Sequence, residues 1–158
     1  MNAKDAKEIA GSFAGSACEV SKPQPGISEP TLVLRNLIPK PGEAMNRETV
    51  LAASLAYQVP EDEQWRYQVR VQFETTTGRG TRGGAFFRKT GGQLVEDHGL
   101  ICGPAGIISI VLPMVHIWAD PDIRHPLGMY FYLVRNKDGD RAQRVVAKVG
   151  PFNYGTMR

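Results

Sequence analysis

Residues 116–125 hold the side chains of this sequence best suited to bind a divalent metal. His116, Asp120, Asp122 and His125 supply two imidazoles and two carboxylates, the ligand types that transition metals prefer. Their spacing fits neither an HExxH helix nor a two-His-one-carboxylate triad, and Asp-Pro-Asp followed by His-Pro is also typical of a turn between strands. We interpret Asp120 and Asp122 as turn residues, and a metal-dependent enzyme built on residues 116–125 remains the alternative hypothesis.

Other patterns resemble catalytic motifs but lack the context that the chemistry needs. Residues 78–83 read GRGTRG, formally a GxGxxG, yet no helix is expected after them to bind a pyrophosphate. Cys102 and His98 are four residues apart, but no orienting partner or oxyanion donor can be named for them. The sequence therefore favours a non-enzymatic protein, with no cofactor and no assigned metal site.

Arginine dominates the basic residues after residue 64. Residues 65–158 carry 13 basic and 7 acidic side chains, ten of the basic ones being arginine, whereas residues 1–64 carry 6 basic and 9 acidic. Guanidinium groups bind phosphates in a bidentate manner, and arginines on a glycine-rich loop adapt to a polyanion without reading its bases. The predicted nucleic-acid contacts are Arg66, Arg70, Arg79, Arg82 and Arg88. An ordinary basic surface with an exposed hairpin loop is the competing interpretation.

The two cysteines, Cys18 and Cys102, are 84 residues apart and form no CxxC motif. We expect two buried thiols and no disulfide. The first twenty residues contain several charged side chains and no apolar block, so no secretory signal is expected. These observations predict a cytoplasmic protein, or a virion protein if the chain is a coat subunit.

A stretch of 21 residues, 99–119, has no formally charged side chain and is long enough for a membrane helix. Gly103, Pro104, Gly106 and Pro113 interrupt it, and its centre is β-branched, which is typical of a buried strand. We expect no membrane span.

The chain has 158 residues, of which 42% are hydrophobic and 22% charged, with 17 glycines and 11 prolines. One folded domain with many short strands is expected. Apolar and polar residues alternate most clearly in 65–74, which predicts a half-buried strand with a polar outer face. Further strands are expected at 31–38, 85–90, 93–97, 106–118 with a bend at Pro113, 128–135 and 143–149, and a turn at 136–140. Residues 46–57 are ambiguous between a helix and a strand, and we favour a helix.

Residues 3–17 place Ala6, Ile9, Ala10, Phe13 and Ala17 at the spacing of a short amphipathic helix or arm.

These elements predict a mainly β protein, an antiparallel β-sandwich or jelly roll with a short N-terminal helix or arm. Residues 1–30 form the arm and its proline-rich connector, and residues 31–158 form the sandwich domain. The strand around 129–134 is apolar or aromatic on both faces, which favours contact with a neighbouring subunit. The leading hypothesis is a self-associating structural protein, such as a viral or phage coat subunit, that contacts nucleic-acid phosphates. A small cytoplasmic nucleic-acid-binding module is a further alternative.

Overall fold

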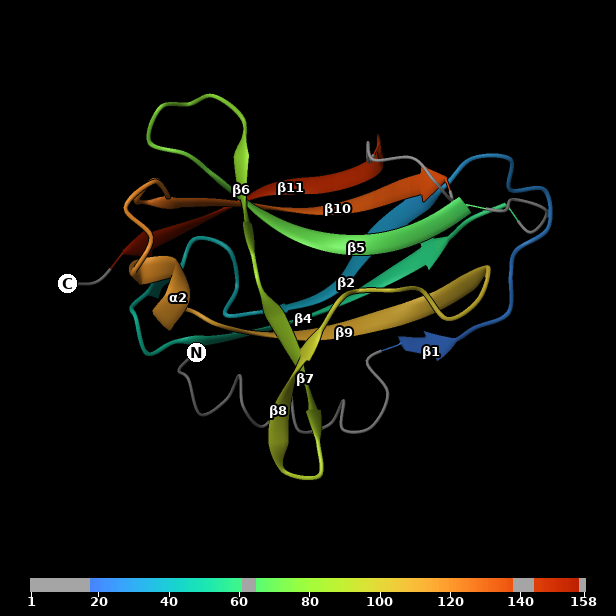
Figure 1. Ribbon diagram of the computed structural model, residues 1–158, viewed down its shortest axis with the longest axis horizontal. Helices are drawn as coiled ribbons and strands as arrows, with labels where there is room; N and C mark the ends of the chain where they lie inside the picture. Colours follow the sequence, from blue (N-terminus) through green and yellow to red (C-terminus); the bar gives the residue numbers. More distant parts are fainter. Residues whose placement is uncertain (1–17, 61–64, 138–143, 157–158) are drawn as a thin grey trace.

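The computed structural model describes residues 18–60, 65–137 and 144–156. Two sheets, antiparallel except for the short pair of β3 with β11, pack face to face, one above the other in Figure 1. The elements are β1 (Cys18–Val20), β2 (Thr31–Ile38), β3 (Ala44–Met45), β4 (Val50–Gln58), β5 (Trp65–Glu74), β6 (Thr81–Gly84), β7 (Phe86–Thr90), β8 (Gln93–Asp97), β9 (Ala105–Pro113), α2 (Val115–Trp118), β10 (Leu127–Lys137) and β11 (Arg144–Thr156). The predicted antiparallel β-sandwich is confirmed.

The first sheet has the order β2-β4-β9-β7-β8, with β1 paired to β9 beside β7, and the second has the order β3-β11-β10-β5-β6. Four strands, β2-β4-β9-β7, thus face β11-β10-β5-β6. This is the Greek-key order of immunoglobulin-type sandwiches. The short strands β6 and β7 follow one another from the second sheet to the first, and the β7–β8 hairpin extends beyond the sandwich (Figure 1).

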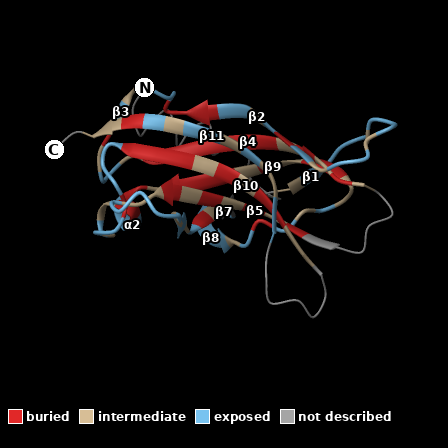
Figure 2. Ribbon diagram, turned by 90° about the horizontal axis from the view of Figure 1, so that it is seen from above, coloured by how far each residue is buried: buried red, intermediate tan, exposed pale blue. Residues whose placement is uncertain are grey.

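Alternating side chains from both sheets fill the core. On β5, Tyr67, Val69, Val71 and Phe73 are at most 3% exposed, and the residues between them point outward. The strand β10 contributes Met129, Phe131 and Leu133 in the same way. Figure 2 shows that buried residues are spread along the central strands of the sandwich. The alternation in 65–74 therefore correctly identified the face of β5 that lies outside.

The helix favoured for residues 46–57 is wrong, because this segment contains β4. Nearly every residue of β4 is buried, and the strands β2 and β9 pair with its two edges. A strand buried on both faces shows no polar alternation. Ala52, Ala53 and Ala56 also have high helix propensity, and tertiary pairing overrides it here.

The other predicted strands are present with small changes of boundary. The strands expected at 85–90 and 93–97 are β7 and β8, which form a hairpin around Gly91 and Gly92, both with positive φ. The strand expected at 106–118 ends at Pro113 and continues into the short helix α2. The last strand is longer than expected and extends to Thr156. The helix predicted for 3–17 lies outside the described residues, as does most of the predicted turn at 136–140.

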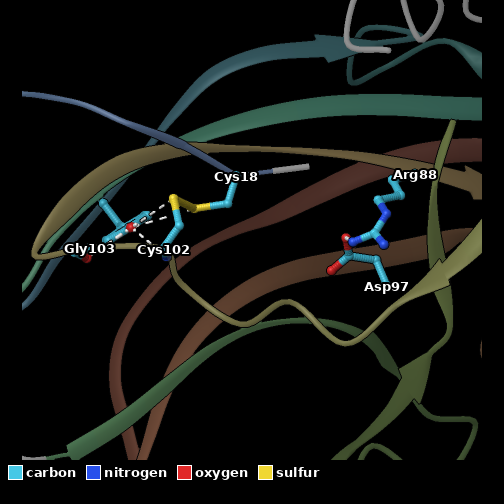
Figure 3. Close-up of a disulfide and its surroundings, with 6 residues drawn as sticks. Cys18, Arg88, Asp97, Cys102 and Gly103 are labelled. Carbon is cyan, nitrogen blue, oxygen red and sulfur yellow. Dashed lines mark hydrogen bonds and ion pairs between the residues drawn. A yellow bond between two sulfur atoms is a disulfide. The ribbon is translucent and has the colours of Figure 1, made fainter. Parts of the chain in front are cut away.

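The expectation of two free thiols is wrong, because Cys18 and Cys102 form a disulfide (Figure 3). It joins the start of β1 to the loop between β8 and β9. The Tyr57 hydroxyl lies beside it, donating to the Gly103 carbonyl at 2.9 Å and accepting the Cys102 amide N–H at 3.1 Å. Disulfides are typical of oxidising compartments, so the cysteines no longer support a cytoplasmic location. Spacing alone could not reveal the bond, because the fold brings together residues 84 positions apart.

Across 18–60, 65–137 and 144–156, no helix has the length and apolar character needed to cross a membrane. The uncharged stretch 99–119 instead forms β9 and α2.

Candidate nucleic-acid interface

The outward face of the second sheet carries a row of cation, aromatic ring and cation across three strands. Tyr132 on β10 lies opposite Arg70 on β5 and opposite Lys148 on β11. Arg70 and Tyr132 are half-buried, and Lys148 is exposed. Directly opposite residues on neighbouring strands have Cβ atoms only about 5 Å apart. A planar, mostly apolar ring is therefore held between two positive groups, and we refer to these three residues as the basic-aromatic row.

Tyr130 extends this row toward β6. Its ring centroid lies 5.9 Å from that of Tyr132, with the ring planes at 52°, and the Lys148 ammonium lies 5.9 Å from the Tyr130 centroid. The Tyr130 hydroxyl donates to Glu74 Oε1 at 2.9 Å, and Arg124 forms an ion pair with the other oxygen of that carboxylate. The hydrogen bond to Glu74 raises the pKa of Tyr130. This ring is thus neutral and fixed in orientation at ordinary pH.

Arg70 has unused hydrogen-bonding capacity. Its Nη2 donates to Gln68 Oε1 at 3.4 Å, a long contact. Its Nε is buried and has no hydrogen-bond partner in the described part of the chain. An unsatisfied buried donor costs about 1–3 kcal/mol, and more when the group is charged.

A hollow of about 320 Å³ lies over the same face. It is lined by Glu74, Gly78, Gly80, Thr81, Arg124, Tyr130, Tyr132 and Lys148. The hollow connects the row to the loop between β5 and β6. Arg79 is exposed at the tip of that loop, between Gly78 and Gly80, whose φ angles are +72° and +68°. The glycines let the chain turn there.

The remaining predicted arginines lie elsewhere. Arg82 is on β6 opposite Phe73, and its Nε lies 2.5 Å from Asp120 Oδ2, with Nη1 3.6 Å from Asp122 Oδ2. Arg88 belongs to the first sheet, where it faces Asp97 at 3.6 Å (Figure 3). Arg66 on β5 lies opposite Asn136, and its side chain is outside the described part. The structure thus places Arg70 in the basic-aromatic row, Arg79 on the loop beside it, and Arg82 and Arg88 next to carboxylates.

The residues considered as metal ligands are used in a turn. The Asp122 amide N–H donates to Asp120 Oδ1 at 3.0 Å, which is an Asx turn. This hydrogen bond and the Arg82 guanidinium lower the pKa of Asp120. His125 packs edge-on against Trp118 at 4.7 Å, and burial lowers its pKa. Among the described residues, no three His, Cys, Asp or Glu side chains are grouped so as to hold a metal ion.

Sequence reasoning missed the aromatic and lysine members of this face. Tyr130 and Tyr132 alternate with the buried Met129, Phe131 and Leu133, so the pattern of residues 129–134 signals two rings on one outer face. That Lys148 and Arg70 flank Tyr132 depends on strand register between distant segments, which the sequence does not reveal.

The fold and this face define an antiparallel β-sandwich with a basic, aromatic sheet surface. No protein-family model, no curated protein and no solved structure matches the chain.

Proposed function

We propose that this protein is a non-enzymatic, self-associating structural subunit that contacts single-stranded nucleic acid through the outward face of its second sheet. The observation that carries the proposal is the basic-aromatic row, in which Tyr132 is flanked by Arg70 and Lys148. A viral or phage coat subunit is one protein of this kind.

Single strands are bound by aromatic rings on which bases stack, next to positive charges that follow the backbone. Tyr130 and Tyr132 provide two adjacent, half-exposed rings. Arg70, Lys148 and the loop residue Arg79 surround them with positive charge. Duplex readout requires an element that enters a groove, whereas this face is a sheet with a shallow hollow. The geometry therefore favours unpaired bases over a duplex.

Arg82 and Arg88 contribute less to the proposed contact. Each faces a carboxylate of its own chain, so binding a phosphate would first require breaking an ion pair. Arg82 nevertheless lies close to the same loop and carries the same charge. It is a matched control for Arg70 and Lys148.

Self-association is supported by the edge strand β8. This strand belongs to the hairpin that extends beyond the sandwich (Figure 1), and its Leu94 and Val95 are 47% and 40% exposed. An exposed apolar edge strand is a template for pairing with another chain. Nearby Leu100 is 57% exposed. A second copy could therefore add strands at this edge and leave the basic-aromatic row free.

The nucleic-acid contact is tested by fluorescence anisotropy with a labelled single-stranded oligonucleotide over a series of salt concentrations. We expect Arg70→Gln and Lys148→Gln each to lower the affinity, and each lost phosphate contact to reduce the salt slope by about 0.7. Tyr132→Leu should lower the affinity at least about fivefold, because a stacked base contributes about 1–3 kcal/mol. Its salt slope should stay unchanged.

Arg82→Gln removes the same charge and should leave the slope unchanged. Equal effects of the Arg70, Lys148 and Arg82 substitutions would mean that overall charge, rather than this face, governs binding. Undetectable binding of the unmodified protein at low salt would exclude the nucleic-acid role.

A further inference from the structure

The two cysteines of the disulfide lie in different surroundings. Cys102, in the loop between β8 and β9, is exposed. Cys18, at the start of β1, packs against the hydrophobic core. A thiolate breaks a disulfide by attacking one sulfur and displacing the other, and access to each sulfur governs which one is attacked. Cys102 therefore presents the sulfur that a thiol from solvent reaches first.

A hollow of about 300 Å³ lies against the disulfide. It is lined by both cysteines and by Arg88, Glu96, Asp97, His98, Leu100 and Ile108. Its size suits a small molecule rather than a protein segment. Among these lining residues are one arginine and two carboxylates, and the arginine is paired with Asp97 (Figure 3). The excess of carboxylates favours the approach of a cationic or uncharged thiol over an anionic one.

Tyr57 holds the Cys102 side of the disulfide in place. Its hydroxyl donates to the Gly103 carbonyl at 2.9 Å and accepts the Cys102 amide N–H at 3.1 Å. The same oxygen lies 3.5 Å from Cys18 Sγ and 3.7 Å from Cys102 Sγ, and Tyr57 belongs to the core. The two backbone hydrogen bonds do not involve the bond between the sulfurs. Cys102 should therefore stay in position when that bond breaks.

The Cys18 side is held by few contacts. The pairing of β1 with β9 covers three residues, from Cys18 opposite Ile108 to Val20 opposite Gly106. The Ser21 amide N–H adds one hydrogen bond to a carbonyl, at 3.0 Å. Val20 is 68% exposed, so this strand buries little apolar surface. Segments with few hydrogen bonds and little burial open at a low cost in free energy. Without the disulfide, β1 should leave the edge of β9.

We infer that Cys102 is a thiol-exchange site, at which a small cationic or uncharged thiol opens the disulfide and releases β1. The incoming thiolate attacks Cys102 Sγ and forms a mixed disulfide with it. The bond between the two sulfurs breaks, and Cys18 leaves as a thiolate that takes a proton from water. The incoming sulfur is oxidised as Cys18 is reduced, so no other oxidant is needed. This inference does not depend on nucleic-acid binding or on the β8 edge.

The site of attack is tested with cysteamine, a small cationic thiol, on the oxidised full-length protein. The reaction is stopped early with N-ethylmaleimide, and the modified peptides are identified by mass spectrometry. We expect at least about fivefold more cysteamine on Cys102 than on Cys18. Adduct mainly on Cys18, or equally on both cysteines, would overturn the assignment.

The role of the hollow is tested by comparing cysteamine with the anionic thiol 3-mercaptopropionate. Each rate is divided by the rate of that thiol with the uncharged disulfide of mercaptoethanol, which removes the difference in intrinsic nucleophilicity. We expect the corrected rate of cysteamine to be at least about twofold higher at low salt, and the difference to shrink as salt screens the charges. Equal corrected rates, or the reverse order, would exclude the hollow as the route of entry.

Release of β1 is tested by hydrogen exchange with mass spectrometry on the adduct whose Cys18 is blocked by N-ethylmaleimide. We expect the Ser21 amide to exchange at least about tenfold faster than in the oxidised protein, and the Cys102 amide to stay within about threefold. Cys18→Ser/Cys102→Ser is the control, because it has neither bond nor adduct, and it should show the same faster exchange at Ser21.

Amides of β10 report whether the sandwich stays folded, and they should remain protected in the adduct. Three outcomes would overturn the inference: unchanged exchange at Ser21 in the adduct and in the double variant, equal loss of protection at Ser21 and Cys102, or loss of protection in β10. The first would mean that β1 stays in place without the bond. The other two would mean that more than β1 opens.

Discussion

Removing the disulfide should cost a large share of the folding free energy. Cys18 and Cys102 close a loop with a sequence separation of 84 residues. The chain-entropy model gives about 4.5 kcal/mol of stabilisation for a loop of that size, and measured values are typically about 2–4 kcal/mol. We therefore expect the double variant Cys18→Ser/Cys102→Ser to lose about 2–4.5 kcal/mol of unfolding free energy. For a chain of this length, that corresponds to a decrease in Tm of roughly 5–15 °C.

Urea unfolding followed by intrinsic fluorescence measures this change, and dithiothreitol provides an internal control. The reductant should lower the stability of the unmodified protein to that of the double variant, and it should leave the variant unchanged. If the unmodified protein unfolds at the same urea concentration with and without reductant, and the variant matches both, the two cysteines are not bonded in solution.

Three further changes test the fold and the edge contact. Tyr154→Phe removes a buried hydroxyl that donates to a backbone carbonyl at 2.7 Å and should cost about 1 kcal/mol at pH 7 by thermal unfolding. Burial raises the pKa of Tyr154, so its contribution is complete below about pH 10 and is lost at higher pH. The variant should therefore lose stability less steeply in alkali. Gly99→Ala should cost at least about 3 kcal/mol in urea unfolding, because φ is +72° and the new Cβ would lie 2.2 Å from the Val69 carbonyl oxygen; a loss below about 1 kcal/mol would contradict this packing. Leu94→Lys with Val95→Lys should convert an oligomer to a monomer in light scattering, and an unchanged mass would remove β8 as the contact.

Strands whose two faces meet different surroundings could be predicted from the alternation of polar and apolar residues. The strand β5 alternates because one face packs in the core and the other lies outside, and the hairpin turn at Gly91 and Gly92 is encoded locally. The strand β4 was missed, because both of its faces are buried and its alanines favour a helix. Local pattern identifies elements where the environment changes from residue to residue, or where a uniformly buried run is β-branched, as in β9; it fails for β4, whose uniform environment is filled largely by alanine.

The candidate site was predictable only in part, because it depends on pairing between distant segments. The outward position of Arg70 followed from alternation within a single strand. Its proximity to Lys148 depends on the register of three strands, and the separation of Arg88 depends on which sheet β7 joins. The ion pair of Arg82 with Asp120 likewise joins residues 38 positions apart. Charge counts alone could not distinguish a free arginine from one that faces a carboxylate.

The proposed function is tested most directly by size-exclusion chromatography with light scattering, recording the ratio of absorbance at 260 and 280 nm across each peak of untagged protein at moderate salt. We predict a regular oligomer with excess absorbance at 260 nm, and a loss of that excess in a variant that combines Arg70→Gln, Tyr132→Leu and Lys148→Gln. A 17.4 kDa monomer free of nucleic acid would contradict the proposal.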